Sequence, residues 1–294
     1  ARVASAGFDA VELLSPSFLG KCVRELREDP FERIRLIAAR MPGTRLRGNA
    51  GGLNLFGFEE PVMYQLFWRL MATAGIKETR ISDAWNDPAM WAFRAGAARS
   101  AGVDPIINVT YSISPRHTDE HFAERVRAAV ALEPYRICLK DPGGLLTPER
   151  VQTLIPTMLS NADGIPIEMH SHCTTGLGPL CTLRAVELGI RIVNVAIPPL
   201  AEDASLPSVF NIAKNLRALG YDPSVDEDVL HPVSRHFEEV ARREGLPVGE
   251  RAEYDHAQYV HQVPGGMISN LSHQLKEVGA ESRLSAVLEE TVTV

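Results

Sequence analysis

Two histidines, His170 and His172, stand one residue apart at the end of a short apolar run. In a β-strand, residues i and i+2 point to the same side, so both imidazoles can bind one metal ion. A His-x-His pair on an edge strand can also be no more than two exposed polar side chains. This run reads as a strand buried on both faces, where an imidazole without a partner is costly. The pair therefore predicts a metal site.

Other ionisable residues also end apolar runs. Lys140 follows the run at residues 136–139, and Asp83 ends an earlier one. Consecutive strands that end in ionisable residues are typical of the active rim of a parallel β/α barrel. Lys140, Asp83 and Cys173, which directly follows the histidines, are the candidate catalytic residues. Asp83 can accept a hydrogen bond from a ligand histidine or cap a surface turn, and Cys173 can be an acid/base or a small packing residue.

Apolar strand-like runs alternate with helix-period segments along most of the chain. Asp87-Pro88 and Thr147-Pro148 have the pattern of a helix start, and Gly75 and Gly189 stand where helices end. This alternation with short connections implies a parallel sheet wrapped by helices, and we expect an α/β fold of the TIM (β/α)8 type. The expected strands are residues 8–14, 45–50, 79–84, 105–111, 136–141, 166–172 and 191–196.

This count gives seven strands, and residues 1–7 read as the tail of a helix. Closing a barrel requires its first strand to pair with its last. We therefore expect one further strand and most of a helix before Ala1; the alternative is a seven-stranded or open sheet. We expect the barrel to span residues 1–220 and a helical C-terminal extension, packed on the barrel, to span residues 221–294.

Composition excludes several classes of function. The chain has 294 residues, of which 45% are hydrophobic and 23% charged, as in ordinary globular proteins. A net charge of −7 without a basic cluster argues against nucleic acid as the main partner. Charged residues interrupt every apolar stretch before it reaches membrane-spanning length. The four cysteines show no disulfide-type spacing, so we expect a reducing, cytoplasmic location.

Six short motifs follow one another along the chain. They are Glu28-Asp29-Pro30-Phe31-Glu32-Arg33, Asp83-Ala84-Trp85-Asn86-Asp87-Pro88, Tyr111-Ser112-Ile113-Ser114-Pro115, Leu139-Lys140-Asp141, His170-Ser171-His172 and Val263-Pro264-Gly265-Gly266-Met267. In order and interval they closely resemble one family, the carboxyltransferase component of pyruvate carboxylase, the oxaloacetate decarboxylase α subunit and transcarboxylase. That family belongs to the metal-dependent barrels that include hydroxymethylglutaryl-CoA lyase.

The resemblance implies a set of metal ligands. In the family, two His-x-His imidazoles, a lysine bearing a carbamate and an aspartate on the first strand hold the metal. His170 and His172 match the imidazoles and Lys140 matches the lysine, while the aspartate would precede Ala1. An unmodified ammonium has no lone pair, so only carbamylation gives Lys140 a ligand oxygen, which suits zinc, manganese or cobalt. Unmodified, Lys140 would instead pair with a nearby acid.

Several positions depart from the family pattern. Gly51 replaces the arginine that grips the substrate carboxylate, and Ala204 replaces the threonine that moves a proton between biotin and substrate. Gly20 and Phe58 replace an aspartate and a tyrosine of the biotin pocket. Losing the clamp and the hydroxyl should each slow ordinary pyruvate carboxylation by orders of magnitude. The small residues should enlarge the pocket for larger carbon acids. The expected substrate-binding residues are Gly51, Asn54, Tyr111 and Ala204.

Three functions fit these features. We favour metal-dependent carboxyl transfer or decarboxylation of a 2-oxo acid or related carbon acid through an enolate. Biotin would sit on a separate carrier, because the chain has no biotin-bearing Met-Lys-Met segment. The alternatives are a biotin-independent metal-dependent C–C lyase or aldolase, and a non-catalytic subunit of a carboxylase complex. The expected partners are a biotin carboxyl carrier protein or biotin carboxylase subunit, and the resemblance implies a homodimer or larger complex.

Overall fold

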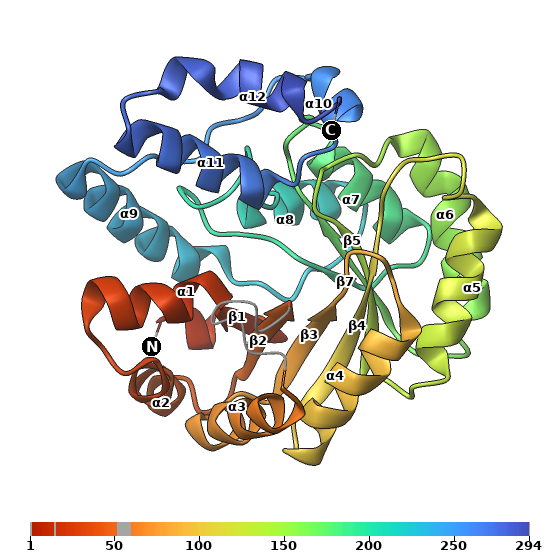
Figure 1. Cartoon of the computed structure of the whole chain (residues 1–294), viewed down its shortest axis with the longest axis horizontal. Coiled ribbons are helices and arrows are strands. Elements are labelled where there is room, and N and C mark those ends of the chain that lie inside the picture. The colour runs from red at the N-terminus through yellow and green to blue at the C-terminus, as the bar shows by residue number, and fades with distance from the viewer. Residues whose placement is uncertain (1, 15, 52–59, 294) are drawn as a thin grey trace.

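Seven parallel strands form one sheet, and their order in the sheet follows their order in the sequence (Figure 1). The computed structural model describes residues 2–14, 16–51 and 60–293. The first six expected strands are confirmed to within two residues at each end. The strands are β1 (Ala10–Leu14), β2 (Arg45–Gly51), β3 (Glu78–Ser82), β4 (Asp104–Thr110), β5 (Arg136–Asp141), β6 (Ile167–Ser171) and β7 (Ile192–Val193).

The sheet curls into a partial barrel, which confirms the expected fold class. Every neighbouring pair of strands is parallel, from β1 with β2 to β6 with β7. Among the described residues, no hydrogen-bonded pair joins β1 to β7. A cavity of about 460 Å³ lies between these two strands, lined by Glu12, Arg80, His170 and Asn194 among others. The expected eighth strand concerns residues outside this sequence.

Helices connect the strands and cover the outer face of the sheet (Figure 1). Asp87 and Thr147 accept hydrogen bonds from Ala89 N and Arg150 N, so both predicted helix starts are confirmed. The α-helices are α1 (Pro16–Lys21), α2 (Pro30–Arg40), α3 (Pro61–Ala74), α4 (Pro88–Ser100), α5 (Asp119–Val130), α6 (Pro148–Asn161), α7 (Gly178–Glu187), α8 (Val209–Ala218), α9 (Glu227–Glu244), α10 (Ala257–His261), α11 (Gly265–Glu277) and α12 (Leu284–Glu290). The described residues also form the 3-10 helices η1 (Arg2–Ser5) and η4 (Glu281–Arg283) and the π-helix η2 (Cys22–Leu26).

One sequence expectation about an element end is corrected. The seventh strand was expected over residues 191–196, but β7 ends at Val193. The chain leaves the sheet there, because Ala196 N donates to Pro207 O at 3.0 Å and Val209 N donates to Ala196 O at 2.9 Å. The first described residues are helical, as expected, and form the 3-10 helix η1.

The inner side of the curled sheet carries buried ion pairs. Arg47 of β2 reaches Glu168 of β6 with two contacts, Nη1–Oε1 at 2.8 Å and Nη2–Oε2 at 3.0 Å. Its Nε donates to Glu78 of β3 at 2.6 Å. Both carboxylates are fully buried. Closed barrels of this class usually fill the same space with branched apolar side chains. Here, the Arg47–Glu168 pair connects β2 with β6, two strands that are not neighbours in the sheet.

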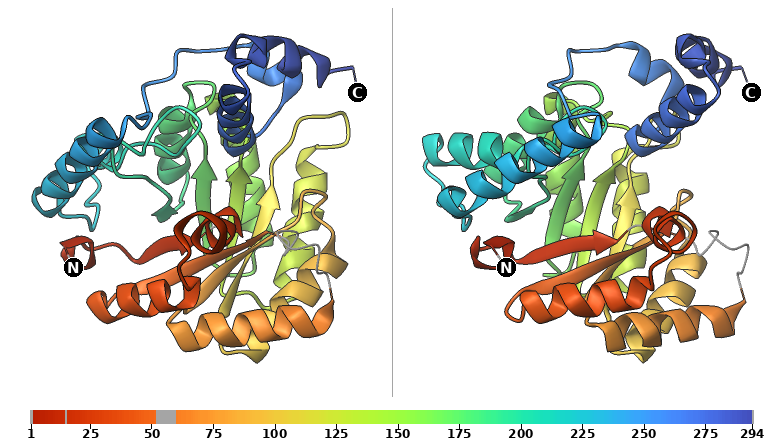
Figure 2. Two further views of the ribbon diagram at one scale, coloured as in Figure 1. Left: turned by 60° about the vertical axis from the view of Figure 1, so that its left-hand side comes forward. Right: turned by 90° about the vertical axis from the view of Figure 1, so that its left-hand side faces the viewer.

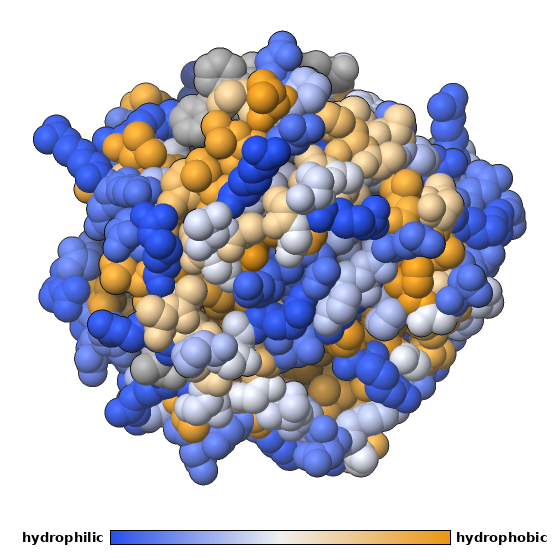
Figure 3. Space-filling model, turned by 90° about the horizontal axis from the view of Figure 1, so that it is seen from below, coloured by the Kyte–Doolittle hydropathy of each residue, from blue (hydrophilic) through white to orange (hydrophobic). Residues whose placement is uncertain are grey.

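The charged network continues to the amino-terminal ends of the strands. Arg45 Nε donates to Glu78 Oε2 at 2.8 Å, and Arg136 Nη1 donates to Asp9 Oδ2 at 2.6 Å. Figure 3 views the end of the molecule where the central strands begin, and hydrophilic residues gather near the middle of that face. The apolar core lies instead between the sheet and the surrounding helices, with Trp68 and Trp91 fully buried.

The C-terminal helices lie beyond the carboxyl ends of the central strands (Figure 2). The longest helix described in this region is α9, which is capped by Asp226 and ended by Gly245 at φ 62°. Its first turn packs against the N-terminal region, where Asp226 N donates to Ala6 O at 2.9 Å and Leu230 contacts Ala6. The boundary at residue 220 stays a prediction. In the described part of the chain, no helix is both apolar and long enough to cross a membrane.

Candidate active site

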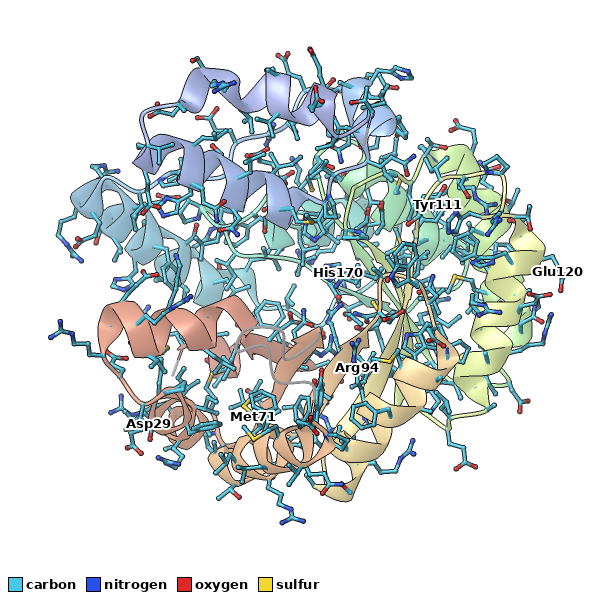
Figure 4. All side chains as sticks on the ribbon, viewed as in Figure 1. Asp29, Met71, Arg94, Tyr111, Glu120 and His170 are labelled. Carbon is cyan, nitrogen blue, oxygen red and sulfur yellow. The ribbon has the colours of Figure 1, made fainter. Side chains whose placement is uncertain are left out.

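The two histidines of the predicted metal site lie together at the carboxyl end of β6. His170 is the fourth residue of the strand and His172 follows its last residue. Both imidazoles point inward, and their Nε2 atoms are 3.3 Å apart. Ser171 points the other way and donates to Asp141 Oδ2 at 2.8 Å. Figure 4 labels His170 near the middle of the molecule, inside the ring of helices. Strand alternation therefore brings the pair together as expected.

Each ring is held at its Nδ1 atom. His172 Nδ1 lies 2.6 Å from the carbonyl oxygen of Ala204. Because a carbonyl can only accept, His172 carries hydrogen on Nδ1 and keeps a lone pair on Nε2. His170 Nδ1 lies 3.0 Å from Asn194 Oδ1 and 2.9 Å from Arg80 Nη1. Metal-ligating histidines are commonly oriented by such a bond at the nitrogen that does not face the metal.

The donor atoms fit a divalent cation. Metal–nitrogen bonds of about 2.0–2.1 Å at angles of about 90–110° place two ligand nitrogens about 2.8–3.4 Å apart. The Nε2 separation of 3.3 Å falls in that range. Burial and the charge of Arg80 hold the pKa of His170 well below its usual range, and burial lowers the pKa of His172 to about 4. Both rings are therefore neutral at pH 7, as metal ligands must be.

Lys140 lies beside the histidine pair. It is the residue before the last of β5, and it is the direct partner of His170 on the neighbouring strand. Its Nζ donates to Ser82 Oγ at 3.2 Å. Burial, with a contribution from Arg80, lowers the pKa of Lys140. Among the described residues, no three His, Cys, Asp or Glu side chains gather as a metal site. Carbamylation of Lys140 and its role as a third ligand stay predictions.

Asp83 follows β3 and organises the loop after it. Its Oδ2 accepts from Trp85 N and Asp87 N, each at 3.0 Å, and its Oδ1 lies 3.7 Å from Arg94 Nη1. These are the contacts of a carboxylate that caps a turn, which is the second of the two alternatives. In the described contacts it does not reach His170. A catalytic role for Asp83 stays a prediction.

Cys173 is buried directly after the histidines. Its side chain is 1% exposed, and burial, followed by the charge of Glu202, raises the pKa of the thiol far above its usual range. Its backbone N donates to Ser205 O at 2.9 Å. A thiol that stays protonated in a packed site fits the packing alternative better than the acid/base alternative. Catalysis by Cys173 stays a prediction.

The four expected substrate-binding residues lie in different surroundings. Ala204 contacts the site through its carbonyl oxygen, which accepts from His172. Tyr111 stacks on Phe122 of α5 with ring centroids 5.6 Å apart, and it also lines the pocket beside Lys140 described below. Gly51 ends β2 beside Ser82. Asn54 lies outside the described residues, as does Phe58. Contact of these residues with a substrate stays a prediction.

A pocket of about 340 Å³ opens next to Lys140 at the carboxyl ends of β3–β5. The barrel contributes Lys140, Ser82 and Thr110, and the C-terminal extension contributes Gln262 and Pro264. Gln262 is fixed by two hydrogen bonds with the backbone of Ile113, at 3.2 and 3.1 Å. The extension therefore forms one wall of the candidate active site. The sequence predicted that the C-terminal extension packs on the barrel, but not that its residues line this pocket.

Sequence reasoning missed Arg80 and Asn194, although both contact His170. Glu78, Arg80 and Ser82 alternate along β3, and this run of polar residues in a buried strand is the signal that could have been used. Asn194 follows the short β7, where its backbone N donates to Met169 O at 2.9 Å. Nothing in the local sequence distinguishes this asparagine from a turn residue.

Comparison with protein families and with known proteins gives consistent results. The HMGL-like family matches residues 91–236, and the conserved carboxylase domain matches residues 259–294. A pyruvate carboxylase subunit of Methanocaldococcus jannaschii is 33% identical over 98% of this chain and 51% of its own length. The methylmalonyl-CoA carboxyltransferase 5S subunit of Propionibacterium freudenreichii is 30% identical over 100% of this chain and 59% of its own length.

Solved structures show the same fold. The carboxyl transferase domain of Rhizobium etli pyruvate carboxylase, solved with oxamate and biotin, has a TM-score of 0.91 at 24% identity. The alignment covers 99% of this chain and 50% of that chain. The chain thus spans about half the length of the relatives it matches.

Proposed function

The chain belongs to the HMGL-like carboxyltransferase family, and from this premise we propose that it carries out metal-dependent carboxyl transfer or decarboxylation on a 2-oxo acid or related carbon acid. The observation that carries the proposal is the pair of imidazole nitrogens, His170 Nε2 and His172 Nε2, 3.3 Å apart beside Lys140. A scaffold without catalysis has little need for two buried neutral imidazoles aimed at one point.

The chain's own residues would bind and orient the reactants. His170, His172 and a carbamylated Lys140 would hold zinc, manganese or cobalt, and a bound divalent cation supplies electrostatic stabilisation of negative charge on an oxygen. Breaking the bond to the departing carboxyl carbon leaves its electron pair as an enolate, which then takes up a proton on carbon. Lys140, Ser82 and Thr110 line the adjacent pocket and would position the carbon acid. Biotin on a separate carrier would accept or supply the carboxyl group.

The names of the relatives and the arginines near Gly51 both bear on the choice of substrate. Two relatives are named for pyruvate and for methylmalonyl-CoA, and a third is named 2-oxoglutarate carboxylase large subunit. Arg45 and Arg47 are the arginines near Gly51, but both are tied to Glu78. They are not free to grip a substrate carboxylate. We therefore expect activity on 2-oxo acids larger than pyruvate, or on acids bound through their carbonyl group.

A biotin-independent lyase is the second candidate. The alanine at 204 favours it, because the position presents only a backbone carbonyl to His172 and no hydroxyl to relay a proton. The wall formed by Gln262 and Pro264 disfavours it, since these residues belong to the segment matched by the conserved carboxylase domain.

The test uses the 294-residue chain loaded with Zn²⁺, Mn²⁺ or Co²⁺. Decarboxylation of oxaloacetate and of larger 3-carboxy-2-oxo acids is followed with and without free biotin or a biotinylated carrier. We expect turnover that depends on both metal and biotin. Turnover that does not depend on biotin would indicate the lyase. The absence of turnover with metal bound would contradict the proposal.

Two histidine variants control this experiment. His172→Ala removes one ligand and should abolish metal-dependent turnover. His236→Ala removes an exposed histidine of α9 and should leave turnover unchanged. Equal loss in both variants would show that the effect is not specific to the site.

A further inference from the structure

Two polar groups lie within hydrogen-bond distance of His170 Nδ1, and they require opposite protonation of this nitrogen. Arg80 Nη1 lies 2.9 Å away and Asn194 Oδ1 lies 3.0 Å away. A guanidinium has only donors, so it requires a lone pair on Nδ1. An amide oxygen only accepts, so it requires a hydrogen on Nδ1. A neutral imidazole can satisfy one of these neighbours at a time.

The orientation of the Asn194 amide is fixed by Arg80. Arg80 Nη2 donates to Asn194 Oδ1, and a guanidinium could not accept from the amide nitrogen. The oxygen therefore faces the site, and its second lone pair is available to His170. Arg80 itself is 2% exposed, with Nε 2.7 Å from Glu12 and Nη2 3.4 Å from Glu168. These carboxylates prevent it from moving away.

The two neighbours of Nδ1 have opposite consequences at Nε2. If Arg80 donates to Nδ1, the hydrogen of the ring sits on Nε2 and points at His172, whose Nε2 lone pair can accept it over 3.3 Å. If Asn194 accepts from Nδ1, the lone pair is on Nε2 and is available to a metal ion. Moving from the first arrangement to the second removes one proton from Nε2 and adds one to Nδ1, so the ring stays neutral.

We propose that Asn194 is a positioning residue that selects the metal-binding tautomer of His170 against the competing guanidinium of Arg80. This inference rests on the proposed metal-dependent function. It assigns a role to a residue that follows β7 and acts through His170. Partners that orient a ligand histidine typically change metal affinity by about 10–100-fold when they are removed.

The test compares variants of Asn194 in the full chain by Co²⁺ affinity, measured by competition with a chelator. Asn194→Leu has a similar volume but no acceptor, and we expect Co²⁺ affinity to fall about 10–100-fold. Asn194→Asp keeps an oxygen acceptor and should bind Co²⁺ at least as tightly as the unchanged chain. Asn215→Leu on α8 makes the same substitution outside the site and should have no effect.

A second readout follows the tautomer directly. In protein labelled with ¹⁵N-histidine, the ring nitrogen shifts of His170 report which nitrogen carries hydrogen. We expect Asn194→Leu to increase the population with hydrogen on Nε2. If this variant does not fold, Asn194→Ser, whose hydroxyl is too short to reach the ring, takes its place.

The outcomes separate the inference from the proposed function. Co²⁺ affinity that is unchanged in folded Asn194→Leu would overturn the inference alone. Equal weakening in Asn194→Leu and Asn194→Asp would also overturn it, because the acceptor oxygen would then not matter. Failure of the unchanged chain to bind Co²⁺ would overturn both.

Discussion

At the residue scale, the two imidazoles of the site differ in what holds them. His172 donates to a backbone carbonyl, that of Ala204, which offers no alternative partner. His170 lies between an acceptor and a donor, Asn194 and Arg80. The protonation pattern of one ligand is thus set by the backbone, and that of the other by competing side chains. Side-chain substitutions should therefore tune metal affinity mainly through His170.

Cys173 provides the first prediction at this scale. Cys173→Ser should leave the turnover number of the metal-loaded chain within about twofold, because the buried thiol stays protonated at neutral pH and is poorly suited to proton transfer. Steady-state decarboxylation of the 3-carboxy-2-oxo acid with the highest turnover measures the effect, with thermal unfolding as the check on folding. A large drop in a folded variant, of about a hundredfold, would place the thiol in the reaction.

The sequence predicted that the two histidines meet, but it did not predict the side chains that contact His170. The i, i+2 spacing of His170 and His172 has one geometric consequence in a strand, so their convergence followed from the sequence. Arg80 and Asn194 come from β3 and from the segment after β7, far apart along the chain. Their meeting depends on how strongly the sheet curls, which local patterning does not specify.

At the element scale, the segment at residues 262–265 forms one wall of the candidate active site. Gly265 N donates to Pro142 O at 2.9 Å, which ties the start of α11 to the loop after β5. A Cβ on Gly265 would lie 2.7 Å from Ala204 O and 2.9 Å from Thr174 Cγ2. The close approach of α11 to the loops of β6 and β7 therefore requires glycine here.

Gly265→Ala should loosen this contact. We expect amide hydrogen exchange over residues 258–268 to accelerate about tenfold or more, because the clash involves backbone atoms that cannot yield cheaply. Gly266→Ala is the matched control, since a Cβ there meets nothing within 4 Å. It should not accelerate exchange. Equal exchange in the two variants would contradict a packed wall.

Element boundaries were predictable where local signals are strong. The cap residues Asp87 and Thr147 predicted two helix starts from residue type alone. The end of β7 was not predictable, because the run from Ile192 to Ile197 is apolar apart from Asn194. Its departure from the sheet depends on the pairing of Ala196 with Ser208, a contact that local patterning does not reveal.

At the scale of the whole molecule, buried charge holds the curled sheet together. Arg47 and Glu168 join β2 to β6 across the interior, and Arg80 connects β3 with Glu12 of β1. The same network reaches the candidate metal site, because Arg80 also contacts His170. Arg80 therefore contributes both to the buried ion pairs and to the position of His170. The predicted homodimer and cytoplasmic location stay predictions.

Glu168→Gln should be strongly destabilising. It leaves the Arg47 guanidinium facing a neutral amide in a buried site, and breaking a buried ion pair costs about 3–5 kcal/mol. Glu187→Gln breaks the surface pair with Arg184 and should lower stability by less than about 1 kcal/mol. Urea unfolding in the presence of EDTA compares the two without a contribution from metal. A loss below about 1 kcal/mol in Glu168→Gln would contradict the structural role of the network.

The most direct test of the account is X-ray absorption at the zinc edge of the chain loaded with one equivalent of Zn²⁺. We expect two imidazole nitrogens at about 2.0–2.1 Å, with oxygen completing the shell and no sulfur. His170→Ala and His172→Ala should each remove one imidazole. A sulfur shell at about 2.3 Å, or a spectrum that neither variant changes, would contradict a metal centre built on these two histidines.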